Sequence, residues 1–504
     1  MASDGQSPAS CYFLGSQNEN KWLRRPHFVL VPLMAPGHMI PMIDMAHLLA
    51  DRAAAVVTIV TTPVNAARIS DIIDAIAHSS LPIRFLSLTF PTAKFGLPDG
   101  CENADLLPSR DLAHNFLDAC KALREPLEQH LQVCSPPPSC IVSDRFHAWT
   151  IDIALELHIP RLFFHGFGCI ALLCVHVVRE HQLLEQTDAI DDDKAFVLPD
   201  FPHRVELSRG QLPSFKTFFS ARKYNDEMVA AEAASDGVMV NSFDEFEPGY
   251  REWCEKAIGK KVWTVGPVFL SNVSEEGTFG RGNKSSIDED WCIKWLDSKK
   301  PGSVIYVSFG SLVQTGFTQL VEIGMGLEAA DQPFIWVIKA GEQALEMEKW
   351  LTDGDGFEER MKGRGLIIRG WAPQATILGH PAVGGFMTHC GWNSTMEAVL
   401  AGMPMVTWPH FGDQFVNEKL IVEILKIGVA VGVNTVVGWR KAQETVVRSG
   451  DVEKAVRRLV DKGQWDGMKQ RVQELSEKAR RAMQPGGSSY CNLIDMVTTY
   501  SPVP

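Results

Sequence analysis

The sequence predicts an α/β fold built from two Rossmann-like, doubly wound domains, and three observations predict it. An apolar strand, a glycine turn and a helix occupy residues 27–51, and a second apolar strand follows at 54–62. The order strand, helix, strand recurs at 303–339. Between the two units, residues 271–290 form a polar stretch rich in Gly and Ser, which is typical of a linker or surface loop. We therefore expect a domain boundary near Pro267.

The first unit carries a candidate base. Its strand HFVLVPL (27–33) leads through the loop MAPGH to a helix expected from Ile40 to Asp51, so His38 lies at the carboxyl edge of the sheet, where such folds bind ligands. The nearby helix N-terminus disfavours an imidazolium, so we expect His38 to be neutral and able to accept a proton. The alternative is a solvated or capping histidine. The loop lacks G-x-G-x-x-G and does not indicate a dinucleotide site.

Asp144 is the candidate partner of that base. It ends the apolar strand CIVSD (140–144), so it also lies at a strand's carboxyl end. A histidine base needs a group that fixes its tautomer and stabilises the cation it forms, and a carboxylate does both. The alternative is that Asp144 is an N-cap for the helix expected to begin near Trp149.

The most informative segment is the 44-residue block Trp371–Gln414 in the second domain. It reads as strand, loop, strand, loop, helix, strand, and the helix begins where His389, Asn393 and Ser394 cluster. The free N–H groups and dipole of a helix N-terminus stabilise an anionic phosphate without a metal. Two alternatives stand beside this interpretation: Ser394 and Glu397 fit a capping box, and lone tryptophans are more often core residues.

The block resembles the signature box of plant secondary-metabolite UDP-glycosyltransferases, glycosyltransferase family 1, over its full length without a gap. The segment PLMAPGHMIPMIDMA (32–46) is similar to that family's N-terminal catalytic segment. The resemblance implies the GT-B fold, with two Rossmann-like domains facing a cleft. The expected parts are a disordered extension (1–25), an acceptor-binding domain (26–266), a UDP-sugar-binding domain (267–485) and a C-terminal helix packing back on the first domain (486–504).

The resemblance also implies roles for individual residues. The catalytic pair is His38 with Asp144. Sugar contacts come from Trp392, Asp413 and Gln414, and a terminal Gln in the box usually accompanies glucose. His165 matches a position that can reach the sugar's 6-hydroxyl, with core packing as the alternative. UDP binding is expected from Ser311, Trp371, Ala372, Gln374, His389, Asn393, Ser394 and Glu397.

The predicted function is an inverting transfer of glucose from UDP-glucose to a hydroxyl of a small lipophilic plant metabolite, such as a flavonoid, other phenolic, terpenoid, steroid or hormone. The product would be a β-O-glucoside. UDP-glucose is a substrate, and no cofactor or metal is expected. The alternatives are an epimerase or hydrolase of the same fold, a non-catalytic sensor and an NAD-dependent oxidoreductase. For the oxidoreductase, the G-x-G-x-x-G fingerprint of a dinucleotide site is missing from the sequence.

Composition narrows the partners and the location. A net charge of -13 over 504 residues argues against a nucleic-acid partner. The eleven cysteines are scattered singly without C-x-x-C spacing, which indicates reduced thiols and a cytoplasmic protein. No apolar run of about 18 residues indicates a membrane span. A monomer that binds a UDP-sugar and a small acceptor is the expectation.

Overall fold

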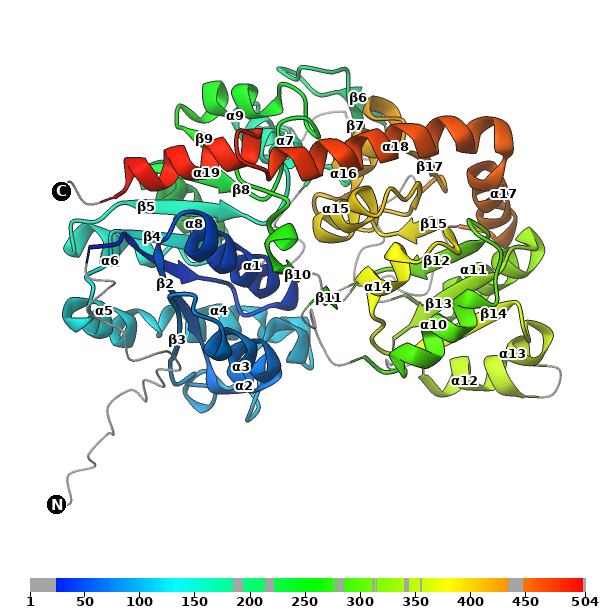
Figure 1. Cartoon of the computed structure of the whole chain (residues 1–504), viewed down its shortest axis with the longest axis horizontal. Coiled ribbons are helices and arrows are strands. Elements are labelled where there is room, and N and C mark those ends of the chain that lie inside the picture. Colours follow the sequence, from blue (N-terminus) through cyan, green and yellow to red (C-terminus); the bar gives the residue numbers. More distant parts are fainter. Residues whose placement is uncertain are drawn as a thin grey trace.

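The computed structural model describes residues 24–184, 194–213, 222–274, 277–278, 285–310, 313, 315–339, 344–353, 356–433 and 447–501. Ser311 and most of the predicted N-terminal extension lie outside these residues. Within them, two parallel sheets flanked by helices form the two halves of the molecule (Figure 1). The two Rossmann-like domains predicted from the sequence are confirmed.

The N-terminal sheet has the strand order β3-β2-β1-β4-β5-β8-β9, with every neighbouring pair parallel. Its strands are β1 (His27–Val31), β2 (Val56–Thr61), β3 (Ile83–Ser87), β4 (Cys140–Asp144), β5 (Arg161–His165), β8 (Gly237–Val240) and β9 (Val262–Thr264). Its helices are α1 (Pro36–Arg52), α2 (Pro63–Arg68), α3 (Ser70–His78), α4 (Ala113–Lys121), α5 (Arg124–Val133), α6 (Thr150–Glu156), α7 (Cys169–Glu180), α8 (Arg222–Ala234) and α9 (Tyr250–Ile258). Two short hairpins pair β6 (Ala195–Val197) with β7 (Glu206–Ser208) and β10 (Val273–Ser274) with β11 (Gly277–Thr278).

The C-terminal sheet has the order β14-β13-β12-β15-β16-β17 and is also parallel throughout. Its strands are β12 (Val304–Ser308), β13 (Phe334–Ile338), β14 (Gly365–Arg369), β15 (Val383–Thr388), β16 (Met405–Thr407) and β17 (Gly428–Ala430). The helices are α10 (Glu289–Asp297), α11 (Phe317–Ala330), α12 (Ala344–Thr352), α13 (Phe357–Arg360), α14 (Gln374–Gly379), α15 (Trp392–Leu400), α16 (Gln414–Lys419), α17 (Ser449–Val460), α18 (Lys462–Ala482) and α19 (Ser488–Thr499).

The strand order explains where a ligand site forms. Helices cover both faces of each sheet, so the strands are continuous apolar runs, and every residue of β1 and β4 is buried. In each sheet the order reverses direction at one point, between β1 and β4 and between β12 and β15. Doubly wound sheets bind ligands at the carboxyl ends of the strands on either side of such a point. Both predicted halves of the site lie there.

Helix α1 begins earlier than the sequence analysis expected. It starts at Pro36 rather than at Ile40, so His38 belongs to the first helical turn. Proline is favoured at this position because its missing N–H would have no partner there and its φ suits a helix. The interior residue Pro41 also belongs to α1, although its ring removes one hydrogen bond of the helix.

The last two helices run across both domains. In Figure 1, α18 and α19 pass along one side of the molecule from the C-terminal sheet to the N-terminal sheet. The Nδ2 of Asn492 donates to the carbonyl of Thr264 at 3.0 Å, and the indole of Trp263 donates to Asp495 at 2.8 Å. Both contacts join α19 to β9. The exact domain boundary near Pro267 stays a prediction.

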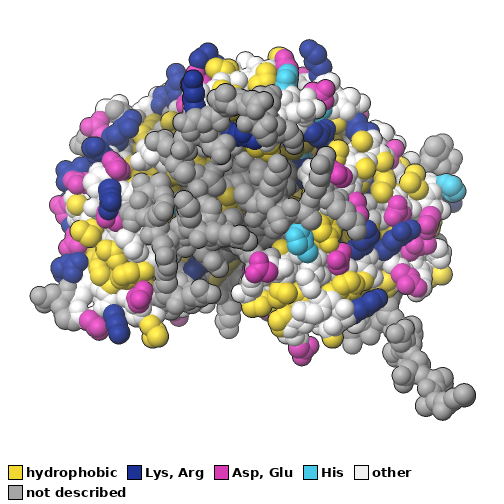
Figure 2. Space-filling view, turned by 180° about the vertical axis from the view of Figure 1, so that it is seen from behind, with side chains coloured by type: hydrophobic (Ala, Val, Ile, Leu, Met, Phe, Trp, Pro, Cys, Tyr) yellow, Lys and Arg dark blue, Asp and Glu magenta, His cyan; other side chains and the backbone are white. Residues whose placement is uncertain are grey.

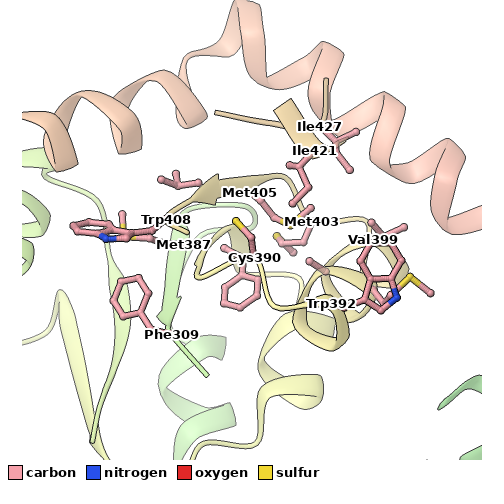
Figure 3. Packing of buried hydrophobic residues seen from close by; sticks show 14 of the residues in the cluster. Phe309, Met387, Cys390, Trp392, Val399, Met403, Met405, Trp408, Ile421 and Ile427 are labelled. Atoms are coloured by element: carbon pink, nitrogen blue, oxygen red, sulfur yellow. The ribbon is translucent and has the colours of Figure 1, made fainter. Parts of the chain in front are cut away.

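A buried cluster stabilises the loop that leads into α15. The rings of Phe309 and Trp408 meet edge to face with centroids 5.5 Å apart, and in Figure 3 Cys390 lies between this pair and Trp392. Cys390 is fully buried and packs in this cluster. On the face shown in Figure 2, the Lys and Arg side chains of the described surface are interspersed with Asp and Glu. No helix among the described residues has both the length and the apolarity to cross a membrane.

Candidate functional site

The centre of the N-terminal half of the site is a hydrogen-bonded pair. The Nδ1 of His38 lies 2.7 Å from Oδ2 of Asp144, and the carboxylate is 2% exposed while the imidazole is 26% exposed. A carboxylate can only accept here, so Nδ1 carries the proton and Nε2 is left as a base. The other oxygen of Asp144 accepts from the backbone N–H of Phe146 at 3.0 Å. The alternative that Asp144 caps the next helix is wrong, because α6 begins at Thr150 without a side-chain cap.

The electrostatics of this pair differ from the sequence-based expectation. Burial disfavours the charged form of both groups, but the charge and hydrogen bond of Asp144 outweigh it and raise the pKa of His38. The pKa of Asp144 is lowered, because His38 and the other donors outweigh its burial. The helix terminus was expected to keep His38 neutral, and that expectation was wrong in direction. The Asp144 carboxylate has a larger effect on the pKa of the imidazole than the helix N-terminus has.

Two further histidines near Asp144, His147 and His165, are buried. The Nε2 of His147 lies 2.9 Å from the carbonyl of Pro32, so this buried ring connects β1 to the loop after β4 and does not point to solvent. His165 is also buried and packs edge to face on Phe167, with ring centroids 3.8 Å apart. Burial lowers the pKa of both imidazoles. They are neutral packing residues in this arrangement.

The C-terminal half of the site contains His389 between two glycines. A Cβ atom built on Gly310 would lie 2.5 Å from Cε1 of His389, and one built on Gly391 would lie 2.3 Å from its Nε2. Any larger residue at either position would displace the ring. Burial lowers the pKa of His389 to about 3, so the imidazole is neutral and one ring nitrogen can donate a hydrogen bond. The loop after β12 thus meets the loop after β15 at His389, and the role of this histidine in diphosphate binding stays a prediction.

Three residues of the predicted UDP site, Gln374, Ser394 and Glu397, are joined by hydrogen bonds. The Nε2 of Gln374 donates to Ser394 Oγ at 3.1 Å and to Glu397 Oε2 at 2.7 Å. Trp371 is half-buried rather than a core residue, and its backbone N–H donates to Ser286 Oγ at 2.8 Å. Ser394 is the third residue of α15, whose N-cap is Gly391, so the capping-box alternative is wrong. Ala372, also predicted for this site, is buried next to Trp371.

Two of the three predicted sugar contacts, Trp392 and Gln414, already use part of their side chains in hydrogen bonds within the protein. The indole of Trp392 is 3% exposed and donates to the carbonyl of Asn241 at 2.6 Å, so this side chain packs on the N-terminal domain. Its backbone N–H, the first of α15, is the group left for a ligand. The Oε1 of Gln414 accepts from the backbone N–H groups of His410 and Phe411, which leaves Nε2 to donate.

Asp413 connects the two halves electrostatically. Burial raises the pKa of Asp413 to about 6, while the hydrogen bond from Asn417 and the charge of His38 oppose the rise. The same charge contact helps to raise the pKa of His38. The predicted sugar-binding carboxylate of one domain and the predicted base of the other domain therefore influence each other's pKa.

Sequence analysis missed Lys339, which follows β13. Strand β13 pairs in parallel with β12, which pairs in parallel with β15, so Lys339 after β13 and His389 after β15 lie at the same carboxyl edge of the sheet. Its charge acts on His389, and it interacts with Asp105 of the N-terminal domain. Although Lys339 is exposed, partial desolvation of its ammonium lowers the pKa to about 8. The strand register was the signal that could have identified it.

A second feature that sequence analysis missed is a direct bond between the domains. The Nδ2 of Asn393 donates to the carbonyl of Gly37 at 3.0 Å, next to His38 in the chain. The two residues are 356 positions apart, so no local sequence pattern predicts this contact. Among the described residues, no group of three His, Cys, Asp or Glu side chains is arranged to hold a metal ion.

Comparisons with known proteins agree with this geometry. Residues 284–477 match the family described as UDP-glucoronosyl and UDP-glucosyl transferase, and residues 27–269 match the family described as glycosyltransferase, N-terminal domain. UDP-glycosyltransferase 73C6 of Arabidopsis thaliana is 46% identical over 475 residues, which are 93% of this chain and 94% of that protein. UDP-glycosyltransferase 1 of Barbarea vulgaris is 45% identical over 479 residues, covering 94% and 95% of the two chains.

Solved structures are similar over the same extent. The crystal structure of Glycyrrhiza uralensis UGT73P12 complexed with glycyrrhetinic acid 3-O-monoglucuronide is 36% identical, has a TM-score of 0.83 and covers 94% of this chain and 96% of its own. Medicago truncatula UGT71G1 complexed with UDP-glucose has a TM-score of 0.77, and at 24% identity that likeness concerns the fold alone. The epimerase or hydrolase alternative is not favoured by these matches. The chain belongs to the plant family 1 UDP-glycosyltransferases, has their GT-B fold, and transfers a glycosyl group from a UDP-sugar to a small metabolite.

Proposed function

We propose that the enzyme transfers glucose from UDP-glucose to a hydroxyl of a small lipophilic plant metabolite and inverts the anomeric carbon. The observation that carries the proposal is the 2.7 Å pair of His38 and Asp144, whose imidazole also feels the charge of Asp413 in the donor-binding domain. This arrangement puts a base with a fixed tautomer beside a group able to bind sugar hydroxyls. The product would be a β-O-glucoside.

The reaction would be a direct displacement. The Nε2 of His38 takes the proton of the acceptor hydroxyl, the oxygen forms a bond to the anomeric carbon, and the bond to UDP breaks on the opposite face. The proton remains on the imidazole, whose positive charge Asp144 stabilises, and the leaving diphosphate takes the electron pair. A single displacement converts an α-linked donor into a β-linked product.

The leaving diphosphate would be stabilised by groups of the protein itself, without a metal ion. The first turn of α15 offers unpaired N–H groups and the positive end of its dipole. Neutral His389 can donate a hydrogen bond, and Lys339 adds a full positive charge at the same sheet edge. Preorganised donors and charges of this kind are the largest contribution to many enzymatic rate enhancements.

Donor choice would depend on Asp413 and Gln414. The half-buried carboxylate of Asp413 can accept from sugar hydroxyls, and the Nε2 of Gln414 can donate to one. Together with the family's usual pairing of a terminal Gln with glucose, this favours UDP-glucose. Ser311, outside the described residues, stays a predicted diphosphate contact. A cytoplasmic location is proposed from the unpaired thiols of the described cysteines.

The acceptor would bind on the N-terminal side of His38. The ring of Phe146 lies 5.8 Å from the His38 imidazole, and Phe146 also lines a pocket with Leu117, Trp149 and Met228. Apolar walls with a few polar groups are typical of sites for small lipophilic molecules. The solved relative from Glycyrrhiza uralensis holds glycyrrhetinic acid 3-O-monoglucuronide, which supports an acceptor of this general kind.

The test is product detection by mass spectrometry with UDP-glucose, a panel of phenolic, terpenoid and steroid alcohols, and excess EDTA. We expect acceptor-dependent glucosides that survive EDTA, and their loss in His38→Ala. The surface variant His181→Ala is the matched control and should retain activity. UDP release without an acceptor, or full activity of His38→Ala, would contradict the proposal.

A further inference from the structure

The carbonyl of Gly37 lacks its usual helical partner. In an α-helix the carbonyl of residue i accepts from the N–H of residue i+4, and for Gly37 that residue is Pro41. Proline has no N–H, and its ring crowds the carbonyl four residues before it. A carbonyl one residue away from His38 is therefore open to an outside donor.

Asn393 of the other domain supplies that donor. Its Nδ2 lies 3.0 Å from the Gly37 carbonyl, and a carbonyl can only accept, so the amide nitrogen must be the atom that faces it. Asn393 is the second residue of α15, the helix whose N-terminus is the proposed diphosphate site. One hydrogen bond thus joins the donor-binding helix to the helix that carries His38.

The amide group has capacity for a second contact. Its nitrogen carries two hydrogens, of which Gly37 takes one, so the other can bind a diphosphate oxygen. Its Oδ1 is buried and has no hydrogen-bond partner in the described part of the chain, so it can accept from a donor hydroxyl. A bound UDP-sugar would therefore fix the same amide that holds the Gly37 carbonyl.

We infer that Asn393 is a positioning residue that couples donor binding to the placement of His38, through the carbonyl that Pro41 leaves free. The inference rests on the proposed role of His38 as base. Separate contacts keep the domains together, because the indole of Trp392 donates to the Asn241 carbonyl at 2.6 Å. Loss of the Asn393 bond should therefore change the placement of His38 without separating the domains.

Pro41→Ala is the sharpest variant, because it changes neither Asn393 nor the diphosphate site. It supplies the missing helical N–H, which competes with Asn393 for the Gly37 carbonyl. We expect a higher melting temperature, since proline is the least favourable residue in a helix interior. We also expect kcat to fall about three- to tenfold with unchanged affinity for UDP, the range that one hydrogen bond provides. A merely structural defect would lower both stability and activity.

A double-mutant cycle and a control complete the kinetic test. Asn393→Ala should lower both kcat and UDP affinity, and Pro41→Ala should cause no further loss of kcat in that background. Pro63→Ala is the matched control, because Pro63 occupies the first turn of α2, where the missing N–H has no role. Additive losses in kcat, or full activity of Pro41→Ala, would overturn the inference.

Hydrogen–deuterium exchange tests the coupling without turnover. UDP should slow amide exchange at the start of α1, residues 37–44, in the wild-type enzyme and not in Asn393→Ala saturated with UDP. Equal slowing in both proteins would overturn the coupling even if the enzyme makes glucosides. If UDP slows amide exchange at residues 37–44 only in the wild type, the coupling is supported, even if His38 proves not to be the base.

Discussion

At the scale of single residues, the proposed role of His38 as the base makes activity depend on the protonation state of its imidazole. The base must be neutral to take a proton, and Asp144 raises its pKa. Activity should therefore fall as the pH drops through this raised pKa and be complete above it. The sign for stability is opposite: the imidazolium–carboxylate pair stabilises the folded state below the unfolded pKa of histidine, and this contribution is lost as pH rises through the folded pKa.

The first prediction concerns Asp144→Asn. Removing the carboxylate should lower the pKa of His38, because burial is then opposed only by the weaker effect of Asp413. The acid limb of the kcat/KM profile should move to lower pH, and kcat should fall by about 100-fold or more because the imidazolium loses its partner. Steady-state kinetics from pH 5 to 9 check this. An acid limb that stays in place would show that another group titrates.

The second prediction concerns Lys339→Met. If Lys339 binds the diphosphate, the variant should lose about tenfold in affinity for UDP and nothing in affinity for uridine. Calorimetric titration with both ligands measures the difference. Lys362→Met is the matched control, because that lysine is 76% exposed in the same domain. Equal losses for UDP and uridine would instead indicate a general disturbance of the fold.

The third prediction concerns Gly310→Ala. Gly310 has φ +70°, and a Cβ there would lie 2.5 Å from His389, so both backbone strain and a clash result. We expect a loss of UDP affinity of at least tenfold. Gly100→Ala separates the two causes, because Gly100 has φ +73° with nothing within 4 Å. That control should be destabilised by about 1 kcal/mol and bind UDP normally.

At the scale of secondary-structure elements, a buried carboxylate from a distant part of the chain satisfies the N-terminus of α7. Glu247 binds the N-terminus of α7, where its carboxylate accepts from the N–H groups of Cys169 at 2.9 Å and Ile170 at 2.7 Å. Burial raises its pKa to about 7, despite these hydrogen bonds. The indole of Trp392 packs against Gly168, the N-cap residue of α7, because a Cβ atom built on Gly168 would overlap the ring.

The fourth prediction follows from this raised pKa. Between the ordinary carboxyl pKa and about 7 the folded state holds a proton that the unfolded state has lost, so the free energy of unfolding falls as pH rises. Relative to Glu247→Gln, wild type should lose up to about 3 kcal/mol from pH 4.5 to 7. Urea denaturation of both proteins at several pH values measures this. A constant difference between them would contradict the raised pKa.

The elements predicted from sequence were those with a strong local pattern. Continuous apolar runs located β1, β4, β12 and β15, because strands buried on both faces leave no alternation. The start of α1 was placed too late, because Pro36 at the first helical position looks locally like a turn residue. Polar side chains at or beyond the carboxyl ends of such strands pointed to His38, Asp144 and His389.

At the scale of the whole molecule, contacts between the domains could not be predicted from sequence. The bond of Asn393 to Gly37 joins residues separated by 356 positions, and the indole of Trp392 crosses to Asn241 over 151 positions. Neither contact follows from a local sequence pattern. The sequence analysis assigned Trp392 to the sugar by resemblance, whereas its side chain packs between the domains. Figure 1 also shows α18 and α19 running along both domains, where α18 contacts α15 and α19 contacts β9.

The most direct measurement is proton NMR of the product formed from UDP-glucose and an accepted acceptor, by wild type and by His38→Ala, with EDTA present. The account predicts one glucoside whose anomeric proton shows the large trans-diaxial coupling of a β-linkage. It also predicts no product from His38→Ala, although that variant still binds UDP. An α-linked product, or a β-glucoside formed at the normal rate by His38→Ala, would contradict the central claim that His38 is the base of an inverting transfer.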